Sequence, residues 1–114
     1  MHAPAPITAR DLQARLGAGE PLQLVDVREA AELELAKLPH PVLHLPLSEA
    51  ERWSPTITTT LAPDRPVVVL CHAGVRSLQM GRWLIEQHGY QDVWNLEGGI
   101  DAWSVEVDPA VPRY

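Results

Sequence analysis

The chain alternates short apolar runs with segments that have the periodicity of helices. Four runs predict β-strands, over residues 22–26, 42–45, 67–70 and 93–96. Helical segments are predicted over residues 7–19 (a short entry segment and a helix), 30–35, 48–53, 77–87 and 100–105. Residues 67–70 are all apolar, which is typical of a strand buried on both faces. This alternation predicts an α/β fold, in which a parallel sheet of about five strands carries helices on both faces.

Polar residues and glycines mark the ends of the predicted helices. Thr8 is the predicted N-cap of the first helix, and Ser77 is the predicted N-cap of the longest one. Gly89 is predicted to end that longest helix. The pair Gly98-Gly99 is predicted to form a turn before the last helix.

Length and composition predict an ordinary globular domain. The chain has 114 residues, of which 46% are apolar and 21% are charged. It contains no internal repeat and no low-complexity segment. We therefore expect a single domain over residues 1–114, with its core at about 7–106 and an extended tail at 107–114.

The charge balance narrows the expected partners and location. The net charge is −6 and there is no basic run, so nucleic acid is not expected as a partner. No apolar stretch approaches the length of a membrane span, and the first ten residues lack the apolar core of a signal peptide. The single cysteine excludes an internal disulfide. We expect a cytoplasmic, reducing location without membrane contact.

The candidate chemistry lies at Cys71, which directly follows the apolar run 67–70. In parallel sheets, ligands bind at the carboxyl ends of the strands. A lone buried cysteine is more often an inert apolar residue. Here, however, the segment Cys71-His72-Ala73-Gly74-Val75-Arg76-Ser77 leads into a helix and includes an arginine. A helix N-terminus and a nearby cation both lower a thiol pKa, so the pattern favours a reactive thiolate.

Other residue types in this segment suit the same chemistry. Gly74 permits a tight backbone turn, and Arg76 offers a fork of donors for an oxyanion. His72 has two open interpretations, as a group that tunes the thiol or contacts substrate, or as a solvent-facing loop residue. Asp26 and Arg28 could shape the site, but hydrogen bonds that tie the strand end to neighbouring loops explain them more simply.

Three stretches carry a resemblance to a known family. They are Asp26-Val27-Arg28-Glu29, the segment from Cys71 to Ser77, and Asn95-Leu96-Glu97-Gly98-Gly99-Ile100-Asp101-Ala102-Trp103. In these stretches the chain resembles the rhodanese sulfurtransferases, over roughly residues 7–106. The end of the chain, residues 101–114, also resembles the tail of rhodanese domains fused to ubiquitin-activating-like enzymes. The resemblance implies a rhodanese-like parallel sheet.

The resemblance also implies a reaction. Cys71 would take sulfane sulfur from thiosulfate or from a protein persulfide, and would pass it to cyanide or a thiol. The backbone amides of the loop would cradle the outer sulfur, and the Arg76 side chain would orient the sulfonate of the donor. The substrate-binding residues would then be His72, Ala73, Gly74, Val75, Arg76 and Ser77. No metal or organic cofactor is expected, and the implied partners are the sulfur donor, the acceptor and sulfur-relay proteins.

Two alternatives remain open. One is a non-enzymatic interaction module of the same fold, although inactive copies in this family typically lack the cysteine. The other is a phosphatase-like or arsenate-reductase-like enzyme. The related phosphatases have five residues between cysteine and arginine, whereas four residues separate Cys71 from Arg76. The shorter loop favours sulfur over a phosphoryl group.

Overall fold

A computed structural model describes residues 3–114, so Met1 and His2, which the predicted domain includes, lie outside the described residues. A five-stranded sheet forms the centre of the molecule, in the order β1-β5-β4-β2-β3, and every pair of neighbours is parallel. The strands are β1 (Ala5–Ile7), β2 (Gln23–Asp26), β3 (Leu43–His44), β4 (Val67–Leu70) and β5 (Val93–Leu96). The predicted parallel α/β sheet is therefore confirmed.

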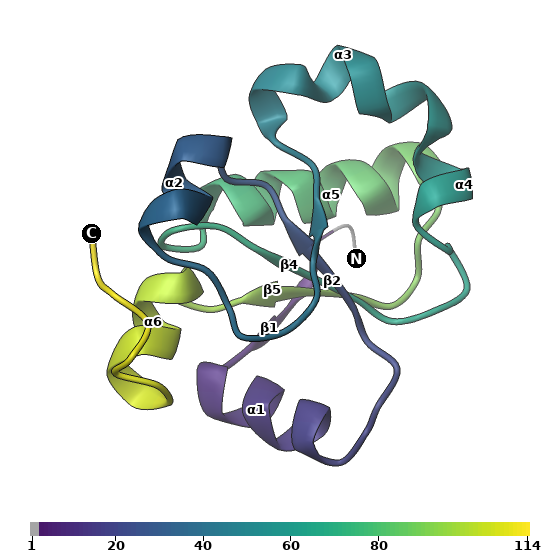
Figure 1. Cartoon of the computed structure of the whole chain (residues 1–114). Coiled ribbons are helices and arrows are strands. Elements are labelled where there is room, and N and C mark those ends of the chain that lie inside the picture. The colour runs from purple at the N-terminus through teal and green to yellow at the C-terminus, as the bar shows by residue number, and fades with distance from the viewer. Residues whose placement is uncertain (1–2) are drawn as a thin grey trace.

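Helices cover both faces of the sheet (Figure 1). They are α1 (Ala9–Gly17), α2 (Ala30–Leu35), α3 (Ala50–Trp53), α4 (Ile57–Thr60), α5 (Val75–His88) and α6 (Gly99–Glu106). Two 3-10 turns, η1 (Leu47–Glu49) and η2 (Ser54–Thr56), flank α3. In Figure 1, α1 and α6 lie on one side of the sheet, and α3, α4 and α5 lie on the other. None of the helices in residues 3–114 is both long and apolar enough to cross a bilayer.

The apolar pattern explains this layering. All four residues of β4 are buried, because β4 pairs with β2 and β5 and has a core on each face. One core cluster contains Leu12 of α1 and Trp103 of α6, and the other contains Met80 and Leu84 of α5. The central strand is therefore buried along its whole length, up to Cys71, which follows it directly.

The predicted helix ends are partly confirmed. The Thr8 side chain caps α1 by accepting a hydrogen bond from the Asp11 amide at 3.1 Å, and Gly89 ends α5 with a φ of 69°. The prediction that Ser77 is an N-cap is wrong, because α5 begins at Val75. Gly74 has a φ of 106°, which lets the backbone turn into the helix earlier.

The tail turns back onto the domain after α6. The Val111 amide donates to the Asp108 carbonyl at 3.0 Å, and Val111 is buried in the core cluster that contains Trp103. The Arg113 guanidinium pairs with the Asp101 carboxylate at 2.8 Å. These contacts place Tyr114 beside the loop that follows β4, which the next section describes.

Candidate active site

Cys71 lies at the carboxyl end of β4, and its Sγ atom is surrounded by hydrogen-bond donors. The Gly74 amide donates to Sγ at 3.0 Å, and the Ser77 hydroxyl lies 3.3 Å from it. Only 1% of the Cys71 surface is exposed. The helix that follows has 14 residues, so its N-terminal dipole adds positive potential at the sulfur.

These donors govern the acidity of the thiol. Burial by itself raises the pKa of Cys71, because it penalises the charged thiolate. Hydrogen bonds from the Ser77 hydroxyl and from the amides of Ser77, Gly74 and Ala73 outweigh burial, so that the pKa lies below its ordinary value. The thiolate is therefore stabilised mainly by the polar groups of its own loop.

A second hydrogen-bonded residue, Asn95 of β5, holds this arrangement in place. The Ser77 hydroxyl is 2.5 Å from Asn95 Oδ1, and Asn95 Nδ2 donates to the Gly74 carbonyl at 3.0 Å. Ser77 has one hydroxyl proton, which Asn95 and the sulfur must share. Asn95 was not among the predicted site residues, although it begins the third stretch of the family resemblance.

The N-terminus of α6 supports the loop from the other side. The Ile100 amide donates to the Cys71 carbonyl at 2.9 Å, and the Asp101 amide donates to the His72 carbonyl at 3.1 Å. Gly99 has a φ of 62°, and a Cβ atom there would lie 2.3 Å from the His72 carbonyl oxygen. The close contact between this helix and the loop therefore requires glycine.

Asp26 and Arg28 form a buried ion pair at the end of β2. Arg28 Nη2 donates to Asp26 Oδ2 at 2.8 Å, and their side chains are 0% and 1% exposed. Arg28 Nη1 donates further, to the Glu32 carbonyl at 3.3 Å and to the Tyr114 hydroxyl at 3.0 Å. The pair thus joins the end of β2 to α2 and to the tail.

Arg76 extends to Glu32 of α2, which sequence reasoning did not identify. Arg76 Nη1 and Nη2 donate to Glu32 Oε2 and Oε1 at 2.8 and 2.9 Å. These hydrogen bonds are the main reason that the pKa of Glu32 falls to about 2. Glu32 lies 44 residues from Arg76 in the chain, so no local pattern indicates the pair.

The remaining loop residues differ in their surroundings. The His72 ring stacks on the Tyr114 ring, with centroids 4.2 Å apart and planes 21° apart. Ala73 and Val75 are exposed, and 68% of the Val75 surface is accessible. No cluster of three or more potential ligand side chains within residues 3–114 is placed to bind a metal ion.

Comparison with known proteins assigns the chain to a family. The family model for the rhodanese-like domain matches residues 8–106. The chain belongs to the rhodanese-like domain family. A protein named sulfurtransferase from Allochromatium vinosum is 38% identical over 98 residues, which cover 86% of each chain. A crystal structure of a rhodanese-like domain protein from Staphylococcus aureus superposes with a TM-score of 0.73 at 29% identity, covering 87% of this chain and 90% of the other.

A longer relative places the same domain in a larger protein. The Rhodanese-like/PpiC domain-containing protein 12, chloroplastic, of Arabidopsis thaliana is 46% identical over 92 residues. The match covers 81% of this chain but only 30% of the plant protein. Rhodanese-like domains that are similar to this one therefore occur both in proteins of comparable length and as parts of longer chains.

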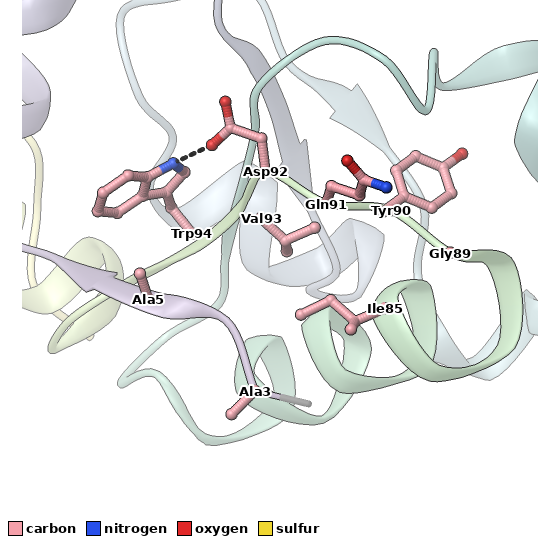
Figure 2. A pocket seen from close by; sticks show the side chains of 9 residues that line it. All are labelled: Ala3, Ala5, Ile85, Gly89, Tyr90, Gln91, Asp92, Val93 and Trp94. Atoms are coloured by element: carbon pink, nitrogen blue, oxygen red, sulfur yellow. Dashed lines mark hydrogen bonds between the residues drawn. The ribbon is translucent and has the colours of Figure 1, made fainter. Parts of the chain in front are cut away.

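In this rhodanese-like domain a cavity of about 460 Å³ lies near the amino end of β5, at the opposite end of the strands from Cys71 (Figure 2). It is lined by the start of β5, the end of α5 and the segment around Ala3 and Ala5. Figure 2 shows the Trp94 indole donating a hydrogen bond to Asp92, the carboxylate that lines this cavity. The distance from Trp94 Nε1 to Asp92 Oδ1 is 2.6 Å. Val93 pairs with Val67 at the amino end of β4, so this cavity is separated from Cys71 by the length of the strand.

Proposed function

We propose that this rhodanese-like domain is a sulfurtransferase in which Cys71 carries sulfane sulfur as a persulfide. The observation that supports it most directly is the set of donors around Sγ, with the Gly74 amide at 3.0 Å and the Ser77 hydroxyl at 3.3 Å. Donors that stabilise a thiolate also stabilise the negative charge of a persulfide. The names of relatives such as the Allochromatium vinosum sulfurtransferase agree with this chemistry.

The proposed reaction has two steps. In the first, the Cys71 thiolate attacks the outer sulfur of thiosulfate or the terminal sulfur of a protein persulfide. A new S–S bond forms, the old bond to that sulfur breaks, and sulfite or the donor thiolate leaves with the electron pair. In the second step, cyanide or an acceptor thiolate attacks the terminal sulfur of the Cys71 persulfide. The sulfur leaves as thiocyanate or as the acceptor persulfide, and the Cys71 thiolate is regenerated.

The other site residues take supporting roles in this proposal. The loop amides from His72 to Ser77 hold the outer sulfur, and Asn95 and the N-terminus of α6 keep the loop in shape. The buried Asp26–Arg28 pair fixes the end of β2 beside the loop. A reduced thiol is required throughout, so we place the protein in a reducing compartment such as the cytoplasm.

The site geometry also bears on the alternatives. A phosphatase of this type needs its loop arginine to bind a phosphoryl oxygen, but the Arg76 fork is occupied by Glu32. The Cys71 surface is 1% exposed, which suits the transfer of a single sulfur atom better than the entry of a bulky phosphate ester. A pure interaction module would have no need of a thiol with a lowered pKa.

The test is the intact mass of the protein after treatment with thiosulfate, and separately with a polysulfide. We expect a gain of one sulfur atom that is lost on adding cyanide and is absent from Cys71→Ser. Val105→Ala is a suitable control, because Val105 is an exposed residue of α6 that lies outside the loop. If neither donor adds sulfur to the folded wild-type protein, the proposal is wrong.

A further inference from the structure

The Arg76 guanidinium is paired with Glu32 through both of its terminal nitrogens. Its two terminal nitrogens donate to the two carboxylate oxygens, in the bidentate geometry that arginine would otherwise offer to an oxyanion. Hydrogen bonds to Glu32 are the main reason that the pKa of Arg76 is raised, and the charge of Cys71 contributes less. Arg76 therefore lies within electrostatic range of the thiol, but its charge is offset by Glu32.

Glu32 is held in this position by further donors. The Glu29 amide donates to Oε2 at 2.9 Å, as part of a capping box at the start of α2. The Tyr114 hydroxyl donates to Oε1 at 2.9 Å and accepts from Arg28 Nη1 at 3.0 Å. Each carboxylate oxygen thus receives two donors, so that Glu32 is fixed from three elements of the fold.

The Tyr114 contacts make the tail part of this arrangement. Its ring stacks on His72, and its hydroxyl joins the Glu32–Arg76 pair to the buried Asp26–Arg28 pair. The guanidinium groups of Arg28 and Arg76 are therefore each paired with a carboxylate. A donor that carries a sulfonate, such as the thiosulfate dianion, would have to compete with Glu32 for Arg76. A persulfide donor presents its terminal sulfur without a sulfonate and does not need that arginine.

We propose that Glu32 is a specificity-determining residue that, by pairing with Arg76, favours persulfide donors over sulfonate-bearing donors. This inference rests on the proposed sulfurtransferase function and specifies which class of donor the site accepts. It also assigns Tyr114 as a positioning residue, because the tyrosine contacts Glu32 and does not contact the thiol.

The test compares Glu32→Gln with Glu34→Gln. Both substitutions remove one negative charge from α2, but Glu34 is exposed, whereas Glu32 binds Arg76. With cyanide as the acceptor, Glu32→Gln should lower the KM for thiosulfate about tenfold, because an unpaired Arg76 can bind the sulfonate. The kcat and the KM for glutathione persulfide should change less than about twofold, because that donor does not use the arginine.

Two further variants show whether the effect acts through the pair. Adding Arg76→Ala to Glu32→Gln should abolish the gain in thiosulfate affinity. If Glu32→Gln fails to fold, Glu32→Asp is the substitute, because it keeps the negative charge but moves it away from Arg76 by one methylene group. Glu32→Asp should give a smaller gain in thiosulfate affinity than Glu32→Gln. An unchanged thiosulfate KM in folded Glu32→Gln, or an equal fall in Glu34→Gln, would overturn the inference.

Sulfate binding separates this inference from the proposed function. In Cys71→Ser, no sulfur transfer can occur, so the rise of Tm with sulfate at constant ionic strength reports anion binding without turnover. The same rise in Cys71→Ser/Arg76→Ala gives the general stabilisation by sulfate, which is subtracted. Adding Glu32→Gln to Cys71→Ser should tighten sulfate binding about tenfold. If sulfate binding tightens but no form of the enzyme transfers sulfur, Glu32 does keep anions from Arg76, but the proposed function fails and donor selection fails with it. If wild type transfers sulfur but neither sulfate binding nor the thiosulfate KM changes, only the Glu32 inference fails.

Discussion

Replacing Ser77 with alanine tests the main physical claim about the thiol, which is that neutral hydrogen-bond donors make it acidic. Ser77 is completely buried in the first turn of α5, and its hydroxyl lies 3.3 Å from Sγ. The hydrogen bond from this hydroxyl is the first of the effects that lower the pKa of Cys71. Its removal should therefore raise that pKa.

The size of the effect follows from the geometry. A hydrogen bond to a charged group contributes about 1.5–3 kcal/mol. The lower end applies here, because sulfur is a distant acceptor and Asn95 Oδ1 competes for the same proton at 2.5 Å. A loss of about 1.4 kcal/mol reduces the thiolate fraction about tenfold at a pH well below the thiol pKa. The more basic thiolate is intrinsically a better nucleophile, which should reduce the net loss of reactivity to about threefold to fourfold.

The assay is the rate of Cys71 alkylation by iodoacetamide as a function of pH. Ser77→Ala should react more slowly than wild type at low pH and about threefold faster above both pKa values, so the two curves should cross. Ser104→Ala is the matched control, because Ser104 is also buried but donates to the Ile100 carbonyl at 3.1 Å within α6. Its curve should follow wild type. Superimposable curves for Ser77→Ala and wild type would refute the reasoning.

Other substitutions test the supports of the site. Gly99→Ala places a Cβ atom 2.3 Å from a loop carbonyl oxygen at a φ of 62°, so urea unfolding should show that the free energy of unfolding falls by about 3 kcal/mol or more. The control is Gly17→Ala, whose Cβ atom would meet nothing within 4 Å and which should be neutral or slightly stabilising. Asp26→Asn leaves the guanidinium of Arg28 buried without its countercharge, so the free energy of unfolding should fall by about 3–5 kcal/mol. A loss below about 1 kcal/mol would contradict the argument that this ion pair stabilises the fold. The folded pKa of Glu32 is about 2 against an ordinary 4.5, so its stabilising effect is present above the ordinary pKa and is lost as pH falls toward 2. Tm measured from about pH 5 to pH 2 should therefore fall more in wild type than in Glu32→Gln, and parallel profiles would contradict this assignment.

The fold was largely predictable because its signals are local. The apolar run 67–70 and the alternation of strands with helices predict the central strand and the parallel sheet, and both are confirmed. The edge strand β1 was not predicted, and only its last residue, Ile7, falls in the predicted entry segment, because its three residues include a proline and only Ile7 is buried. The start of α5 was predicted two residues too late, because the left-handed conformation of Gly74 replaces a side-chain cap.

In the candidate site, contacts between residues close in the sequence were predictable, and contacts between residues far apart in the sequence were not. Cys71, Gly74 and Ser77 lie within one seven-residue segment, so their proximity follows from the sequence. Glu32 and Tyr114 meet across 82 residues, and their contact depends on how α2 and the tail pack at the carboxyl edge of the sheet. Donor geometry of this kind is set by tertiary packing, which no periodicity in the sequence reports.

The charged residues around the loop change what makes the thiol reactive. Sequence reasoning assigned part of that role to Arg76, but Arg76 pairs with Glu32, and Arg28 pairs with Asp26. The thiolate is instead stabilised by neutral donors whose positions are fixed by α5 and α6. Such donors keep their orientation when salt screens exposed charges, because they are buried and held by backbone hydrogen bonds. The chemistry of Cys71 therefore depends on the shape of the loop, which explains why glycine is required where α6 approaches it.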